Sequence, residues 1–200
     1  MGKERPKSTR VRLFVALDLP DAVRDGIEAW GASHLGDPAL RRVAVESLHI
    51  TLAFLGSREE KEVEQIAAVV GESAAPAPWI ELRDPVARPP RGRPRLFALP
   101  APSEAVASLQ SGLAERLVGA RLLEPEERSF WPHVTVARVR AESRGARRPM
   151  AVSSFPGPLP ADLSKPFRGV RMTLYRSELQ SRGARYVPLT QVELSASGRQ

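Results

Sequence analysis

Two His-x-Thr segments, residues 49–51 and 133–135, carry the side chains whose types and spacing best suit them to chemistry. Residues i and i+2 of a β-strand point to the same side, so each segment would present an imidazole and a hydroxyl together. An imidazole has an ordinary pKa of about 6.5, so one can accept a proton near neutral pH while another donates one. The pattern favours general acid–base attack on a phosphoester, with the hydroxyls donating to phosphoryl oxygens.

A single His-x-Thr strand is most often structural, but this sequence has two copies in two matched halves. Residues 12–17 are echoed by residues 95–100, 83 positions later, and the second His-x-Thr segment follows the first by 84 positions. Each half reads as strand, helix and His-x-Thr strand, which predicts a pseudo-twofold architecture with both polar faces across one cleft. The candidate catalytic residues are His49, Thr51, His133 and Thr135.

Strict strand alternation predicts which neighbours share these polar faces. It places Ala53 on the polar face of the first strand and Phe54 on the apolar face. In the second strand it places Ala137 on the polar face and Arg138 on the apolar one. Arg138 then reaches the cleft only if a bulge or strand twist turns it, and otherwise serves a structural ion pair. We favour the first alternative, in which a bulge or strand twist turns Arg138 toward the cleft.

Hydrophobic periodicity places helices and further strands around the two motifs. Helices are predicted after Asp21, after the capping-box spacing of residues 57–60 and after Ser103. Strands are predicted at residues 12–17, 48–55, 79–82, 95–100, 132–139, 170–175 and 186–194. Residues 140–160 are rich in Arg, Ser and Pro and are predicted to be a loop. We expect one bilobal domain over residues 10–196, after a flexible basic tail at residues 1–9.

Charge and cysteine content narrow the classes of function. The 200-residue chain has a formal net charge of +7 and a pI of about 10.6, which favours an anionic, phosphate-bearing partner. An Arg-rich genomic composition is the alternative explanation of this charge. With no cysteine, the sequence excludes disulfides, thiolate catalysis and cysteine zinc sites. It also lacks an apolar leader and any apolar run near the ~20 residues that span a bilayer, so we expect a cytoplasmic protein without membrane contact.

Other catalytic patterns are missing from the sequence. Two His residues without a nearby Asp or Glu make a poor divalent metal site. There is no Gly-x-Ser-x-Gly elbow and no Gly-x-x-x-x-Gly-Lys phosphate loop. We therefore expect neither a metal nor a cofactor.

Both motifs resemble the signature motifs of the 2H phosphoesterases, and among these the RNA 2′,3′-cyclic phosphodiesterases, historically called 2′-5′ RNA ligases. The residues that carry the resemblance are 49–56 and 133–138, supported by 12–17, 94–97 and 174–177. The resemblance implies an α+β, bilobal, pseudo-twofold fold in which two antiparallel sheets, flanked by helices, enclose a central cleft.

The same resemblance implies an activity. It implies metal-independent hydrolysis of an RNA terminal 2′,3′-cyclic phosphate to a 2′-phosphate, with His49 as proton donor and His133 as proton acceptor. The residues alone do not distinguish these roles, because the motifs are pseudo-equivalent. The reverse reaction would be 2′-5′ RNA ligation, a secondary activity because water is the more abundant acceptor. The expected partner is RNA with a 2′,3′-cyclic phosphate end, and we expect a monomer.

Four further residues are candidate substrate contacts. Arg95 begins the second-half echo and matches a family position, so it is a candidate phosphate contact, with a solvated surface Arg as the alternative. Phe14 and Tyr175 can stack on a terminal base. Core packing is the alternative for both, and we favour it for Phe14. Arg138 is the fourth candidate, if it turns toward the cleft.

Two other functions stay open at this point. One is a phosphodiesterase acting on small cyclic nucleotides or on RNA 3′ ends. The other is an RNA-end binding module without turnover, which would need no acid and base. The intact pair of His-x-Thr motifs argues against the binding module.

Overall fold

The computed structural model describes residues 9–143, 145–180 and 183–195 of the chain. Residues 1–8 of the predicted tail, and residue 196 at the end of the predicted domain, lie outside the described residues, so both bounds stay predictions. The α-helices in the described part are α1 (Asp21–His34), α2 (Val63–Gly71) and α3 (Glu104–Gly119). The strands there are β1 (Arg10–Asp18), β2 (Leu40–Arg42), β3 (His49–Glu59), β4 (Trp79–Ile80), β5 (Val86–Arg88), β6 (Leu96–Pro100), β7 (His133–Val139), β8 (Phe167–Arg168), β9 (Arg171–Gln180) and β10 (Gly183–Glu193).

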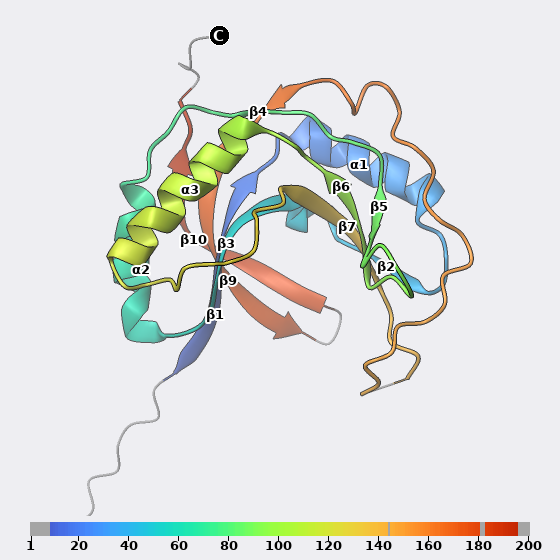
Figure 1. Cartoon of the computed structure of the whole chain (residues 1–200), viewed down its shortest axis with the longest axis horizontal. Coiled ribbons are helices and arrows are strands. Elements are labelled where there is room, and N and C mark those ends of the chain that lie inside the picture. Colours follow the sequence, from blue (N-terminus) through green and yellow to red (C-terminus); the bar gives the residue numbers. More distant parts are fainter. Residues whose placement is uncertain (1–8, 144, 181–182, 196–200) are drawn as a thin grey trace, which may run out of the picture.

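Within the described residues, eight of these strands form one antiparallel sheet (Figure 1). Its order is β10-β9-β1-β3-β7-β6-β5, with β2 also paired to β7, while β4 and β8 form a separate pair. The two predicted sheets are thus two arms of one sheet, joined where Ile50 of β3 pairs with Val134 of β7. We call β10, β9, β1 and β3 the first arm, and β7, β6, β5 and β2 the second arm.

The ladders on either side of this junction correspond to each other. Asp18 lies opposite His49 in the first arm, and Pro100 lies opposite His133 in the second. Equivalent positions of β1 and β6 are therefore 82 residues apart, one fewer than the sequence echo indicates. Because successive strand residues point to opposite faces, this one-residue slip places Arg95, the expected counterpart of Arg12, on the other face of the sheet.

Of the three predicted helix caps, one is confirmed and two are wrong. Ser103 caps α3 as predicted, since its hydroxyl accepts a hydrogen bond from the Val106 N–H at 3.2 Å. Asp21 is the first residue of α1 rather than its cap. The predicted box at residues 57–60 is instead formed by Glu59 and Glu62, because β3 pairs with β1 as far as Glu59 and delays the helical turn.

Two helices each follow a strand of one arm and pack against the other arm (Figure 1). Helix α1, which follows β1, lies against the second arm, where Glu28 forms an ion pair with Arg42 of β2 at 3.2 Å. Helix α3, which follows β6, contacts β3 of the first arm, and α2 contacts β9 and β10. Their buried apolar side chains, such as Ile27 and Leu117, complete the core behind the sheet.

The remaining expectations, on the short strands and the long loop, are confirmed in part. The strand predicted at residues 79–82 is confirmed only as the two-residue β4, whereas β2 and β5 were not predicted because three residues carry no readable period. Residues 140–160 hold no helix and no named strand in their described part, as predicted. Among the described helices, none has the length and apolar character needed to cross a membrane.

Candidate active site

A β-bulge in each His-x-Thr strand decides which side chains reach the cleft. Thr51 and Ala53 lie opposite consecutive β1 residues, and Thr135 and Ala137 lie opposite consecutive β6 residues, so the residue between each pair is extra. After the bulge the alternation reverses. The predicted placement of the two alanines on the polar face is therefore wrong, since they are 7% and 0% exposed.

The next residue in each strand turns toward the cleft for the same reason. Phe54 is 74% exposed and lines the cleft, which corrects its predicted place on the apolar face. Arg138 also lines the cleft, so the bulge favoured for it is confirmed. Phe54 and Arg138 are equivalent positions of the two halves, and the first is aromatic where the second is cationic.

The cleft has a volume of about 610 Å³ and contains all four candidate catalytic side chains. The Ile50–Val134 pairing is antiparallel, so it places His49 on the Thr135 side and His133 on the Thr51 side. The two arms contribute different chemistry to this cleft. The described residues that line it are Arg12, Leu13, Phe14, Arg41, Val43, Ser47, His49, Thr51, Phe54, Gly56, Leu96, His133, Thr135, Arg138, Ser177, Leu179, Ala184 and Tyr186.

Both candidate catalytic imidazoles are oriented by a backbone carbonyl two residues earlier in the chain. His49 Nδ1 lies 2.7 Å from the carbonyl oxygen of Ser47, and His133 Nδ1 lies 2.8 Å from that of Trp131. A carbonyl oxygen only accepts, so each Nδ1 carries the proton and donates it. In the neutral form each Nε2 is therefore the basic nitrogen. Thr51 can donate its hydroxyl to His49 Nε2, 3.0 Å away.

Each imidazole is also held by an aromatic ring. Phe14 stacks on His49 with ring centroids 5.1 Å apart, and Tyr186 meets the same imidazole edge-on at 5.5 Å. Trp131 stacks on His133 at 4.0 Å, and the Arg88 guanidinium lies 4.1 Å above the Trp131 ring. Aromatic packing of this kind limits rotation of the imidazoles and removes them partly from water.

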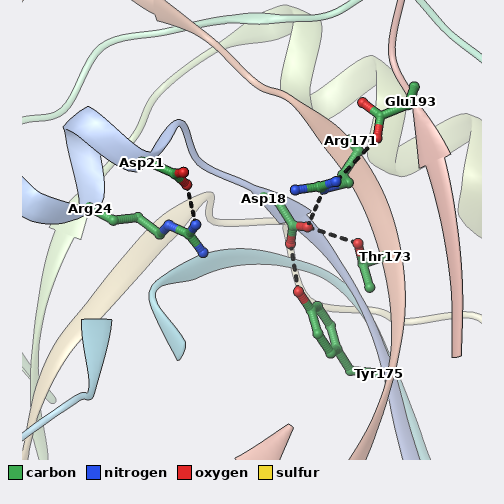
Figure 2. A network of polar contacts seen from close by, with 7 residues as sticks. All are labelled: Asp18, Asp21, Arg24, Arg171, Thr173, Tyr175 and Glu193. Atoms are coloured by element: carbon green, nitrogen blue, oxygen red, sulfur yellow. Dashed lines mark hydrogen bonds and ion pairs between the residues drawn. The ribbon is translucent and has the colours of Figure 1, made fainter. Parts of the chain in front are cut away.

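A buried carboxylate on β1 distinguishes His49 from His133, and Figure 2 shows the polar contacts around this carboxylate. Asp18 is 6% exposed, and its carboxylate accepts hydrogen bonds from Arg171 Nε at 3.1 Å, the Thr173 hydroxyl at 2.8 Å and the Tyr175 hydroxyl at 3.0 Å. Arg171 also reaches Glu193 at 3.2 Å. Burial and the charge of Asp18 raise the pKa of Tyr175 to about 12, so its hydroxyl stays a donor.

The charges around His49 are mixed, since Asp18 raises its pKa while His133 and Arg138 lower it, whereas the charges around His133 only lower the pKa of that imidazole. Burial lowers the pKa of His49 below its usual value, while the Ser47 carbonyl and the Asp18 carboxylate oppose this effect. Burial also lowers the pKa of His133, and there the Arg88 and Arg138 cations lower it further. The local charges thus favour the protonated form of His49 more than that of His133.

The structure separates the four predicted substrate contacts. Phe14 and Arg138 line the cleft. Tyr175 lies behind Phe14, with ring centroids 5.3 Å apart, and does not line the cleft. Arg95 is exposed outside the cleft, where its neighbour Leu96 takes the lining position.

Sequence reasoning missed two other groups of cleft residues. Tyr186 reaches the cleft from β10, where it pairs with Ser177 of β9. Arg12 and Arg41 also line it, from β1 and β2. None of the described lining residues is acidic, and Arg12, Arg41 and Arg138 have no carboxylate partner within residues 9–143, 145–180 and 183–195. The cleft is therefore positively charged.

A comparison with protein-family models decides the family. Residues 19–178 match the model described as the 2′-5′ RNA ligase superfamily. The chain belongs to this superfamily. The resemblance read from the two His-x-Thr motifs is confirmed.

Two relatives named RNA 2′,3′-cyclic phosphodiesterase are similar to this chain over about nine tenths of their length or more. The chain is 31% identical to an RNA 2′,3′-cyclic phosphodiesterase of Thermus thermophilus, over 92% of this chain and 90% of the relative. It is 28% identical to an Escherichia coli protein of the same name, over 89% of this chain and 93% of that protein. The crystal structure of E. coli LigT complexed with 3′-AMP superposes with a TM-score of 0.74 at 27% identity, covering 94% of this chain and 99% of that one. The predicted bilobal α+β fold is confirmed.

Proposed function

We propose that this protein hydrolyses an RNA terminal 2′,3′-cyclic phosphate to a 2′-phosphate. The observation that carries the proposal is the paired site, in which two imidazoles with fixed Nδ1 protons lie beside two Thr hydroxyls in one cationic cleft. The names of the relatives support the same reaction. The expected cytoplasmic location and monomeric state stay predictions.

Two proton transfers complete the proposed reaction. His133 Nε2 takes a proton from water as the water oxygen forms a bond to phosphorus. The bond from phosphorus to O3′ breaks, and protonated His49 gives its Nε2 proton to that oxygen. The product carries a 2′-phosphate and a 3′-hydroxyl. His133 then releases its proton to solvent and His49 takes one up, which restores the starting state.

The surrounding charges support these roles for the two histidines. A proton donor needs neighbours that favour the imidazolium, and the Asp18 carboxylate acts in that direction on His49. A proton acceptor needs neighbours that disfavour it, and Arg88 and Arg138 act in that direction on His133. The ladder position equivalent to Asp18 is Pro100, which carries no charge.

The remaining side chains stabilise the phosphoryl group and hold the nucleoside. Thr51, Thr135 and Arg138 donate to the non-bridging oxygens as negative charge builds on them. The terminal base stacks on the exposed ring of Phe54, with Tyr186 beside it. Phe14 and Tyr175 support His49 from behind. Arg95 contacts no phosphate in this proposal, because it is exposed outside the cleft.

The proposed reaction uses neither a metal nor a cofactor. A five-membered cyclic phosphate is strained, so acid–base catalysis and hydrogen-bond donors suffice to open it. Within the described residues no group of three or more His, Cys, Asp or Glu side chains is arranged to hold a metal ion. The reverse reaction, 2′-5′ ligation of a 5′-hydroxyl, uses the same groups and is proposed as a secondary activity.

The test of this function is the product formed from a defined RNA end. The protein is incubated in EDTA with an oligonucleotide that ends in a 2′,3′-cyclic phosphate, and the product is identified by phosphorus NMR. We expect a 2′-phosphate. A 3′-phosphate would reverse the regiochemistry, and loss of turnover in EDTA with recovery on adding a metal would contradict the mechanism. Binding of the RNA end without turnover would instead favour the binding module.

A further inference from the structure

We infer, on the basis of the proposed function, that Arg41 forms a subsite for the phosphodiester on the 5′ side of the terminal nucleotide. The preferred substrate class is then an RNA end with at least one internal phosphodiester, rather than a free cyclic mononucleotide. The cationic second arm of the cleft carries this subsite.

Arg41 and Arg138 are direct partners in the ladder between β2 and β7. Directly opposite residues of an antiparallel pair place their Cβ atoms about 4.5–5.5 Å apart on the same face. Both arginines line the cleft. Their neighbours Arg42 and Ala137 are also opposite each other, and they face the helix side, where Arg42 pairs with Glu28.

This cross-strand pair carries two like charges that no carboxylate of the described chain neutralises. Like charges directly opposite each other destabilise a sheet. Three other arginines near the second arm do have a carboxylate partner: Arg42 pairs with Glu28, and Arg93 and Arg148 pair with Glu142. An anion bound between Arg41 and Arg138 removes the repulsion, so the pair is arranged for a ligand rather than for stability.

The strand that carries Arg41 is firmly anchored, so the backbone of this residue has a fixed position beside the cleft. The Val43 N–H donates to the Val136 carbonyl at 2.9 Å, directly at the bulge of β7. Before β2, the Asp37 carboxylate accepts hydrogen bonds from Ala39 N–H at 2.8 Å and from Ser153 N–H at 2.8 Å. Because the backbone is already ordered, binding of an anion costs only the conformational entropy of the Arg41 side chain.

The two arginines act at different depths of the cleft. The charge of Arg138 acts on both His49 and His133, so its guanidinium serves the reacting phosphate between them. Arg41 lies on β2, the strand next to β7, whereas Arg138 lies on β7 itself, the strand that carries His133. Arg41 therefore serves the neighbouring phosphodiester, which lies farther from the histidines along the second arm.

The shape of a nucleotide fits this division of the cleft. When the 2′,3′ edge of the ribose faces the histidines, the base and the 5′ carbon leave the ring from its two ends, at C1′ and C4′. The base then points toward the aromatic first arm, with Phe54 and Tyr186, and the 5′ phosphodiester points toward the second. The free energy of this contact is electrostatic and independent of base identity.

The test compares three substrates in the presence of EDTA. They are a nucleoside 2′,3′-cyclic phosphate, a dinucleotide ending in the same cyclic phosphate, and that dinucleotide with an uncharged methylphosphonate linkage. The variants are Arg41→Ala and Arg41→Lys. Arg42→Ala is the matched control, because it removes the same charge from the same strand on the opposite face.

We expect wild-type kcat/KM to favour the charged dinucleotide over the mononucleotide. Arg41→Ala should reduce this preference on the order of 10-fold, mainly through KM, because it removes a charge-assisted contact. Arg41→Lys should restore part of it, and Arg42→Ala should keep it. The Tm of Arg41→Ala should not fall, since the substitution relieves a repulsion.

The outcomes separate this inference from the proposed function. If wild type hydrolyses none of the cyclic phosphates, the proposed function fails. If wild type hydrolyses them all and Arg41→Ala changes the three substrates by the same factor, the subsite is wrong. The subsite is also wrong if the methylphosphonate dinucleotide responds to Arg41→Ala as strongly as the charged one.

Discussion

Asp18 lies directly opposite His49 in the ladder between β1 and β3, and its buried carboxylate raises the pKa of that imidazole against the effect of burial. The equivalent residue opposite His133 is Pro100. Two halves with the same His-x-Thr motif thus differ in a carboxylate beside the imidazole. We propose that this difference gives the two histidines separate roles within a nearly symmetric site.

Removal of the negative charge of Asp18 should shift one limb of the pH profile of kcat/KM. In Asp18→Asn the pKa of His49 falls further, so the protonated donor is lost at a lower pH. The alkaline limb of kcat/KM should therefore move to lower pH, while the acid limb, set by His133, stays in place. Glu193→Gln is the control, because it removes the other carboxylate partner of Arg171 at the surface. Equal movement of both limbs in Asp18→Asn would contradict the assignment.

Burial of both imidazoles predicts a mildly acidic optimum for the free enzyme. The pKa of His133 is lowered below its usual value of ~6.5. The acid limb of kcat/KM, where this base becomes protonated, therefore lies below that pH. The pKa of His49 is also lowered, so activity declines as the pH rises and the donor loses its proton.

Substrate binding should move this profile. A bound phosphate anion raises both imidazole pKa values, so the kcat profile should lie at higher pH than the kcat/KM profile. Initial rates at saturating and at low substrate concentration, measured from pH 4.5 to 9, give the two curves. Superimposable curves would mean that the phosphate does not lie between the imidazoles.

Both catalytic imidazoles should be essential, whereas the third histidine should not. His49→Ala and His133→Ala each remove one proton transfer and should lower kcat on the order of 10²-fold or more. His34 is exposed at the end of α1, where it stacks on Trp30 with ring centroids 5.6 Å apart. His34→Ala should keep wild-type turnover. Single-turnover rates on a cyclic-phosphate RNA measure all three variants, and near-wild-type rates for either cleft variant would refute the two-histidine mechanism.

The order of the elements and the four catalytic candidates could be predicted because they depend on local patterns. Strand alternation placed His49 and Thr51 together, and the repeated motif placed His133 and Thr135 beside them. A bulge is not visible in alternation, because it inserts one residue without changing residue types. The small residue at position 53 in the first motif, and at position 137 in the second, was the available signal for where each strand turns inward.

The rest of the site depends on contacts between distant segments. Arg41 lies on a three-residue strand whose existence depends on pairing with β7, almost 100 residues later. Tyr186 reaches His49 only because β9 and β10 pair beside β1. Asp18 ends a strand and reads as an ordinary polar stop until its partners, Arg171 and Thr173, are brought to it. Sequence periodicity gives no information on such pairings.

The exposed ring of Phe54 should contribute binding free energy but no stability. It lies on the cleft face after the bulge and is 74% exposed, so Phe54→Ala removes a platform for the base without opening a cavity. Stacking of a base on an aromatic ring contributes about 1–3 kcal/mol, so KM should rise on the order of 10-fold while kcat and Tm change little. Phe155→Ala is the matched control, since Phe155 is 62% exposed and does not line the cleft. Steady-state kinetics and thermal melts of both variants test the assignment. A loss in kcat with unchanged KM, or the same KM increase in Phe155→Ala, would show that the base does not stack on Phe54.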